Sequence, residues 1–377
     1  MILPGATLGM LGGGQLGRMF TVAARTMGYR VIVLDPDPHS PAGRIADRHI
    51  NANFLDGGAL RELSSSCVAI TTEFENVPSD TLDILAKTCC VRPSSNALSI
   101  TQDRINEKDF LVTHHVPTNK FVAVSAEEEI ASAFKRVGSP AILKRSRLGY
   151  DGKGQWKVES VEEAIEAFHK MGSAPCVLEE LLRFKCEISV VLARGVNGHI
   201  AAYPTAENIH TNSILDTTIV PARVSRTISA KAQKIARTIA EKLNYHGVLA
   251  VEMFVMRDGR ILVNEIAPRP HNSGHYTLDA CVTNQFEQQV RTLCGLEPGD
   301  TRLISPVVMI NLLGDVWGKS QPAWENLFDH SNVKLHLYGK DHARPGRKMG
   351  HFNVLDKSLT KALNLARSIK AKLTVQN

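Results

Sequence analysis

An apolar strand pattern that runs into three consecutive glycines and then into a helical pattern is the strongest constraint on how this chain can fold. Thr7–Leu11 has the apolar character of a buried strand, and the hexapeptide GGGQLG that starts at Gly12 has the spacing G-x-G-x-x-G. A helical periodicity follows over Leu16–Met27, and the next apolar run, Arg30–Leu34, ends in Asp35. This order of strand, glycine turn, helix and strand predicts an open parallel sheet.

The glycine loop has three interpretations. The free N–H groups of a helix N-terminus attract phosphate, glycines let the backbone approach it, and an acid at the position of Asp35 can bind a ribose. A dinucleotide fits this pattern, a mononucleotide phosphate fits it equally well, and a tight turn without any ligand is the third reading. The loop alone therefore indicates an anion site without identifying the anion.

The length and net charge of the chain limit the classes of protein to which it can belong. A chain of 377 residues has room for two or three domains, and 44 Lys+Arg against 38 Asp+Glu leave a net charge of only +6. No block of like charge suggests nucleic acid as a partner, and no apolar run reaches the roughly 18–20 residues of a membrane span. The start of the chain lacks the features of a secretory signal. Seven cysteines without a Cys-x-x-Cys pair predict reduced thiols in a cytoplasmic protein.

Breaks in the patterns predict three domains. Pro93 and the polar cluster that follows it end the first pattern, so we expect an N-terminal α/β domain over residues 1–100. Residues 101–300 mix strands and helices in the α+β manner. Residues 301–377 begin with the apolar strand Val307–Leu312 and end in a helix over Leu359–Lys372, which predicts a small C-terminal domain.

Two carboxylates lie within apolar strand patterns. Glu252 and Glu265 belong to runs that Asp258-Gly259 joins, and an Asp-Gly pair between apolar runs predicts a β-hairpin. A buried carboxylate requires a partner, and two of them beside the Asn264 amide suit Mg²⁺. An ordinary ion pair, with Arg269 as the nearest cation in the sequence, is the alternative.

Three polar segments complete the candidate site. Ala267–His275 is stiffened by two prolines around Arg269 and presents His271, which indicates a site for anions and protons. Lys144–Gln155 is rich in glycine and lysine and could close over a polyphosphate, although it is not a Walker A loop. Cys176–Leu182 could be a hinge that meets an adenine edge.

The order of these features resembles the ATP-grasp superfamily. A lysine at a strand end is followed by a glycine-rich flap, a Val-Leu-Glu-Glu hinge, and then the strands that carry Glu and Asn-Glu. Five segments further resemble one of its families, 5-(carboxyamino)imidazole ribonucleotide synthase: Leu11–Met19, Thr72–Pro78, Gly149–Gln155, Ala267–Thr277 and Arg344–His351. The resemblance covers essentially the whole chain. It implies a Rossmann-like pre-ATP-grasp domain, a central ATP-grasp domain and a small C-terminal domain, usually in a homodimer.

The resemblance also implies a reaction and its residues. The substrates are ATP, bicarbonate and 5-aminoimidazole ribonucleotide, with Mg²⁺ as cofactor. ATP contacts fall on Arg104, Lys144, Gly149, Tyr150, Asp151, Gly152, Lys153, Gly154, Gln155, Glu179, Glu180, Leu181, Leu182, Glu187, His210, Asn264 and Glu265. The metal ligands are Glu252 and Glu265, and the catalytic residues at bicarbonate are Arg269, His271 and Lys348. The ribonucleotide falls on Gly14, Gln15, Glu75, Tyr150, Asp151, Arg347 and Lys348, with its phosphate at the glycine loop.

Other functions remain open at this stage. Another ATP-grasp ligase, such as a formate-dependent glycinamide ribonucleotide transformylase, shares the nucleotide machinery. A nicotinamide-dependent oxidoreductase explains the glycine loop and Asp35 but leaves Glu252 and Glu265 without a role. A nucleotide-binding regulator without activity is the third alternative.

Overall fold

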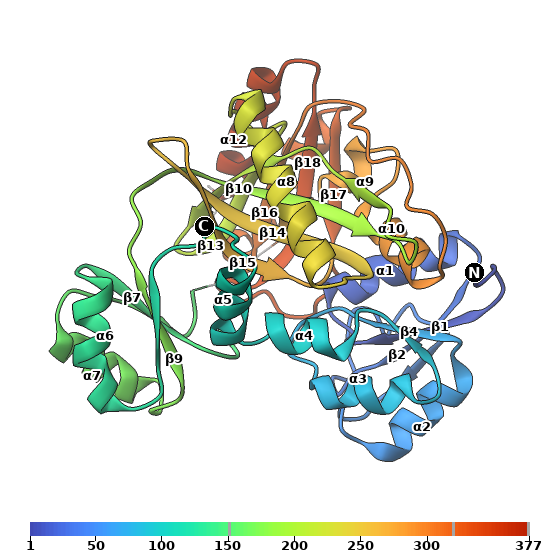
Figure 1. Cartoon of the computed structure of the whole chain (residues 1–377). Coiled ribbons are helices and arrows are strands. Elements are labelled where there is room, and N and C mark those ends of the chain that lie inside the picture. Colours follow the sequence, from blue (N-terminus) through green and yellow to red (C-terminus); the bar gives the residue numbers. More distant parts are fainter. Residues whose placement is uncertain (150–151, 319–320, 375–377) are drawn as a thin grey trace.

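The computed structural model describes residues 1–149, 152–318 and 321–374, and Figure 1 shows how their parts are arranged. A parallel sheet at the N-terminal end lies below a large sheet, and a smaller lobe projects to one side. The described helices include none that is long and apolar enough to cross a membrane. All seven cysteines are free thiols, as predicted.

The N-terminal part is the predicted open parallel sheet, with strand order β3-β2-β1-β4-β5. Its strands are β1 (Thr7–Leu11), β2 (Arg30–Leu34), β3 (Arg48–Ile50), β4 (Ala69–Thr72) and β5 (Cys90–Val91). Its helices are α1 (Gln15–Thr26), α2 (Gly57–Ser66), α3 (Ser79–Ala86) and α4 (Ser95–Thr101). Helix α1 buries Leu16, Phe20 and Ala24, which lie four residues apart and therefore share one face.

The projecting lobe is a four-stranded antiparallel sheet of order β6-β9-β7-β8 (Figure 1). Its strands are β6 (Phe121–Val124), β7 (Ala141–Arg145), β8 (Gln155–Val158) and β9 (Cys176–Glu180). The short 3₁₀ helix Glu127–Glu129 precedes α6 (Ile130–Val137), which packs with α7 (Val161–Lys170) on this sheet, and α5 (Arg104–Thr113) leads into the lobe.

The large sheet joins the central and C-terminal parts of the chain in the order β15-β14-β10-β12-β13-β16-β18-β17, with β11 paired to β10. Its strands are β10 (Phe184–Arg194), β11 (Ile200–Ala202), β12 (Ala206–Thr211), β13 (Ile214–Val220), β14 (Gly247–Met256), β15 (Ile261–Ala267), β16 (Val307–Leu313), β17 (Val333–Leu337) and β18 (Lys348–Leu355). The helices of this region are α8 (Arg226–Lys242), α9 (Thr277–Ala280), α10 (Gln285–Leu293), α11 (Glu325–Phe328) and α12 (Leu359–Thr374), with 3₁₀ turns at Asn272–Gly274 and Gly314–Val316.

Two features of this sheet position the site. The predicted hairpin is present: β14 pairs antiparallel with β15, and the turn places Gly259 at φ +84°, a conformation that glycine adopts without strain. The C-terminal strands continue the same sheet across residue 300, because β16 pairs with β13. The C-terminal part therefore reaches the central site through an unbroken ladder of hydrogen bonds.

Candidate active site

A cavity of about 770 Å³ lies where the three parts of the chain meet. It brings together most of the residues predicted for the site: Gly14, Gln15, Glu75, Arg104, Lys144, Gly149, Gly152, Lys153, Gln155, Glu187, His210, Glu252, Asn264, Glu265, Arg269, His271 and Lys348. These residues come from all three parts of the chain, so each part contributes to one shared cavity.

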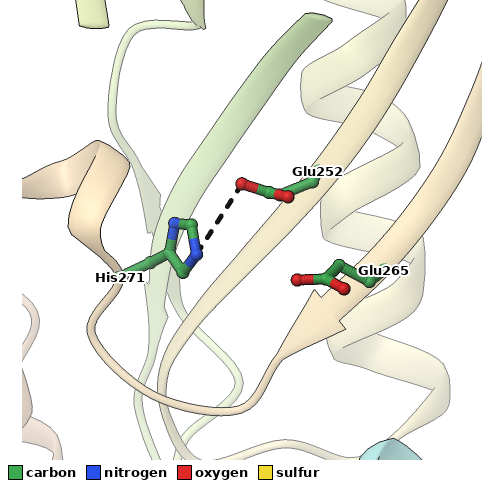
Figure 2. Close-up of side chains that lie close together, drawn as sticks. All are labelled: Glu252, Glu265 and His271. Carbon is green, nitrogen blue, oxygen red and sulfur yellow. Dashed lines mark ion pairs between the residues drawn. The ribbon is translucent and has the colours of Figure 1, made fainter. Parts of the chain in front are cut away.

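The acidic pair lies on the hairpin as predicted. Glu252 on β14 is directly opposite Glu265 on β15, and Figure 2 shows both carboxylates turned toward the same space. Burial, together with the neighbouring Glu265, raises the pKa of Glu252 to about 7, although His210 counteracts this. Arg104 Nη2 lies 3.2 Å from Glu265 Oε2. Glu265 therefore has a cationic partner, and the two carboxylates still form an oxygen set that a cation would stabilise.

His271 completes this group from the loop that follows β15 (Figure 2). Ligand atoms of Glu252, Glu265 and His271 lie within 4.8 Å of one another. The distance from His271 Nε2 to Glu252 Oε1 is 3.7 Å. Burial lowers the pKa of His271 well below its usual value, and the charges of Arg269 and Lys348 lower it further. The imidazole is therefore neutral and can act as a hydrogen-bond donor or acceptor.

Arg269 is bound by Glu75, a residue from the segment after β4. Its Nε donates to Glu75 Oε2, and its Nη2 donates to Glu75 Oε1 at 3.2 Å. Burial alone would raise the pKa of Glu75, but the Arg269 guanidinium holds it below its usual value. Glu75, predicted as a ribonucleotide contact, thus also orients the predicted bicarbonate residue across a domain boundary.

The side chain of Lys144 is held by the buried carboxylate of Glu179. Its Nζ donates to Glu179 Oε2 at 2.8 Å, and Lys108 Nζ lies 3.6 Å from Glu179 Oε1. Burial would raise the pKa of Glu179, but these two lysines hold it well below its usual range. Asn119 Nδ2 donates a further hydrogen bond to Glu179. Glu179 therefore remains ionised and fixes the lysine predicted to contact phosphate.

Glu187 and His210 lie together at the nucleotide side of the cavity. His210 Nδ1 is 2.7 Å from Glu187 Oε2. Burial alone would lower the pKa of His210, but Glu187 and Glu252 raise it above its usual value. The pair provides a carboxylate and an imidazole ring on the adjacent strands β10 and β12.

The N–H groups of the glycine loop have partners within the chain. Gly14 N donates to Glu73 Oε1 at 2.5 Å and Gly17 N donates to Glu73 Oε2 at 2.7 Å, and phosphate binding at this loop stays a prediction. Gly13 N donates to Asp35 Oδ2 at 2.6 Å, so Asp35 binds the loop itself rather than facing a ribose. Carboxylates of the chain thus lie at this helix start: the buried Glu73 and the half-buried Asp35 accept from the N–H groups of Gly13, Gly14 and Gly17. Both loop residues predicted for the ribonucleotide, Gly14 and Gln15, line the cavity.

Some predicted residues do not line the cavity. Gly154, Arg347 and the segment 179–182 lie outside its lining, and Tyr150 and Asp151 lie outside the described residues. Arg347 Nη1 instead donates to His342 O at 2.9 Å. In the predicted hinge, Glu180 N donates to Lys120 O and Leu181 N donates to Pro140 O, so both amides are already paired. Adenine binding at this hinge stays a prediction.

Sequence reasoning missed three charged residues at the site. Glu73 holds the glycine loop, Glu107 lines the cavity beside Glu265, and Lys340 Nζ donates to Gln15 Oε1 at 2.5 Å and to Lys348 O at 2.7 Å. Burial raises the pKa of Glu107 to about 8. Glu73 falls within the resembling segment Thr72–Pro78, which could have signalled it; nothing local distinguishes Glu107 or Lys340 from surface residues.

Models of three families match successive parts of the chain. The Ribonucleotide synthetase preATP-grasp domain matches residues 5–102, the ATP-grasp domain residues 109–286, and the Phosphoribosylaminoimidazole carboxylase C-terminal domain residues 307–364. The chain is 45% identical over 355 residues to the N5-carboxyaminoimidazole ribonucleotide synthase of Bacillus subtilis, covering 94% of this chain and 93% of that relative. The chain belongs to the N5-carboxyaminoimidazole ribonucleotide synthase family.

Solved structures of this synthase family have the same fold. The Staphylococcus aureus N5-carboxyaminoimidazole synthetase complexed with ADP is 36% identical, with a TM-score of 0.92 over 99% of this chain and 98% of that one. The Aspergillus clavatus N5-carboxyaminoimidazole synthase in complex with ADP and 5-aminoimidazole ribonucleotide is 32% identical, with a TM-score of 0.89 over 98% of each chain. The predicted fold class and the predicted family are therefore confirmed.

Proposed function

We propose that this chain carboxylates 5-aminoimidazole ribonucleotide with bicarbonate at the expense of ATP, forming N5-carboxyaminoimidazole ribonucleotide, ADP and phosphate in purine biosynthesis. Membership of the synthase family supports this proposal. The structural observation that carries it is one cavity in which the acidic pair, the Arg269–Glu75 pair and Lys348 meet. Such a cavity can hold a nucleotide and place a second substrate beside its terminal phosphate.

The chemistry proceeds in two steps. An oxygen of bicarbonate attacks the γ-phosphorus of ATP, and the bond to the bridging oxygen breaks, which gives carboxyphosphate and ADP. The exocyclic amine of the imidazole then attacks the carboxyl carbon, either directly or after carboxyphosphate releases CO₂, and phosphate and a proton leave. Bicarbonate is a poor electrophile at neutral pH, so this activation by ATP is what makes the carboxylation possible.

The residues of the cavity have distinct roles in these steps. Lys144 and Arg104 neutralise phosphate charge, and Glu179 and Glu265 orient their side chains. Arg269, fixed by Glu75, binds the bicarbonate anion, and the neutral His271 donates a hydrogen bond to it without adding charge. Lys348 approaches from β18 and stabilises the negative charge that develops on the transferring group.

The donor set of the hairpin fits Mg²⁺. Glu252, Glu265 and the Asn264 amide supply oxygen ligands, and burial together with the neighbouring Glu265 raises the pKa of Glu252, as expected for two carboxylates held close together. When bound there together with ATP, Mg²⁺ would neutralise charge on the phosphates. We therefore assign Glu252 and Glu265 as its ligands.

The test is release of ADP with ATP and Mg²⁺, with bicarbonate and 5-aminoimidazole ribonucleotide added separately and together. We expect rapid release only when both are present, and label from bicarbonate should appear in an acid-labile product. ADP release that does not depend on the imidazole nucleotide would be consistent with ATP-grasp chemistry. It would contradict 5-aminoimidazole ribonucleotide as the acceptor. A change in NAD(P)H absorbance is the control for the oxidoreductase alternative.

We further propose a cytoplasmic homodimer. Seven free cysteines support a reducing compartment, and dimers are usual for the family that the chain resembles. Light scattering after size-exclusion chromatography measures the assembly directly: about twice the mass of 41.3 kDa is expected, and the mass of one chain would contradict the dimer.

A further inference from the structure

The side chain of Gln285 is buried beneath the loop that carries His271. It is the first residue of α10 and has no exposed surface. Its Oε1 accepts a hydrogen bond from His271 N at 2.9 Å, and its Nε2 donates to His271 O at 2.9 Å and to His275 Nδ1 at 2.9 Å. The one carbonyl and both N–H groups of the amide are thus used, which fixes its orientation.

The side chain of Gln285 makes the hydrogen bonds to the His271 backbone that a neighbouring strand would make within a sheet. His271 follows the end of β15 and precedes the 3₁₀ turn Asn272–Gly274, so its backbone belongs to no ladder in the described sheets. A single side chain binds both its N–H and its C=O, and the C=O also accepts from Gly274 N at 2.9 Å. The approach depends on Gly274, because a Cβ there would lie 2.5 Å from Gln285 Oε1.

The imidazole of His271 is oriented by a second contact. Ser189 Oγ donates to Ser273 Oγ at 2.8 Å, and Ser273 Oγ lies 2.9 Å from His271 Nδ1. The Ser273 backbone N–H also donates to Nδ1 at 3.3 Å. Because an N–H can only donate, Nδ1 is an acceptor, and the hydrogen of the neutral ring is on Nε2. Nε2 is the atom that faces Glu252 at 3.7 Å (Figure 2).

The same helix provides a matched control. Gln288 is also fully buried, its Nε2 donates to Gly299 O at 2.8 Å, and its Oε1 accepts from Gly299 N at 2.9 Å. It therefore makes the same kind of two-sided contact with a backbone, but neither it nor Gly299 lines the cavity. Loss of either glutamine removes two hydrogen bonds to a backbone, loss of Gln285 also removes the one to His275, and only loss of Gln285 releases His271.

We propose that Gln285 is a positioning residue: it holds the backbone of His271 so that Ser273 can direct the Nε2–H of the imidazole toward the bicarbonate end of the cavity. This inference rests on the proposed function, because it assigns Gln285 to the bicarbonate step. Nucleotide binding depends on Lys144, Glu187 and His210, which Gln285 does not contact.

The experiment compares Gln285→Met, Gln285→Glu and Gln288→Met in the full chain. Methionine keeps the length of the side chain and removes every hydrogen bond. For Gln285→Met we expect kcat to fall about 10- to 100-fold, or the KM for bicarbonate to rise by that factor, while the KM for ATP stays within about twofold. Gln288→Met should lose similar thermal stability and keep kcat within about threefold.

Gln285→Glu keeps the shape and the acceptor toward His271 N but removes the donors when ionised. Its activity relative to the unsubstituted chain should therefore increase as pH falls and the carboxyl group gains a hydrogen. Equal kinetic losses in Gln285→Met and Gln288→Met, or a loss confined to the KM for ATP, would overturn the inference. Absence of imidazole-dependent ADP release from the unsubstituted chain would instead overturn the proposed function, so the two failures are distinguishable.

Discussion

Glu252 and Glu265 carry like charges at paired positions of β14 and β15, and each has a different neighbour. Arg104 contacts Glu265, whereas Glu252 faces the neutral His271 at 3.7 Å. The repulsion between the two carboxylates therefore acts mainly on Glu252, whose pKa is raised to about 7 by burial and by Glu265. Single substitutions of these two residues can distinguish an effect on the stability of the fold from an effect on metal binding.

Glu265→Gln tests the metal assignment through turnover. It removes one carboxylate from the oxygen set while keeping the shape of the side chain, so we expect ADP release to fall about 100-fold or more. Glu241→Gln on the exposed face of α8 is the control and should leave the rate unchanged. Normal turnover in Glu265→Gln, with circular dichroism unchanged, would exclude Glu265 as a ligand.

Glu252→Gln tests the same site through pH. A carboxyl group with a folded pKa of about 7 and an ordinary value of 4.5 retains its proton longer in the folded state. Unfolding then releases a proton between these values, so this group lowers the free energy of unfolding as pH rises from about 4.5 to 7. The metal-free Gln variant should be more stable than the unsubstituted chain at pH 8, by about 1–3 kcal/mol, with no advantage at pH 4. Urea titration at both pH values measures this; a less stable variant at pH 8 would contradict the prediction.

At the scale of elements, the glycine loop and the first turn of α1 lie close together. A Cβ on Gly17 would lie 2.6 Å from Gly12 O and 3.2 Å from Glu73 Oε2. Helix α1 can approach the loop only because this position lacks a side chain, and the approach lets Gly17 N reach the Glu73 carboxylate.

Gly17→Ala should therefore move α1 away from the loop. We expect a loss of about 1–3 kcal/mol in the free energy of unfolding and a higher KM for the ribonucleotide, because Gln15 begins the same helix. In Gly57→Ala, at the start of α2, the new Cβ would meet only Arg61 Nη1 at 3.5 Å, so stability should be unchanged or slightly higher. Similar losses in both variants would show that the packing at Gly17 is not the cause.

At the scale of the whole molecule, α10 connects two parts of the chain. Val290, Leu293 and Cys294 belong to the same core as Leu8 and Val31 of the N-terminal sheet. The end of α10 also binds the start of the chain, since Ile2 N donates to Cys294 O at 2.7 Å. The core of the N-terminal part is thus completed by residues almost 200 positions after that part ends.

Residues 1–102 alone should therefore not form a stable domain. We expect this fragment to bind a hydrophobic dye and to unfold without a cooperative transition, because the core that its sheet and α1 share with α10 loses the α10 residues. Residues 284–296 joined through a short Gly/Ser linker to its N-terminus should restore a cooperative transition, because Cys294 lies beside Ile2 in the fold. A cooperative transition in the unextended fragment would contradict this interpretation.

The patterns within short windows of the sequence determined the elements of this protein and its acidic pair. Strand and helix periodicities, the Asp-Gly turn and the carboxylates at 252 and 265 are local features, and the structure has them as predicted. Tertiary structure decided how the charges pair. The partner of Arg269 is Glu75, the glycine loop binds Glu73, and Glu179 anchors Lys144. The physical reason is that a buried charge takes the nearest compensating group in space, and chain folding, not sequence spacing, determines which group that is.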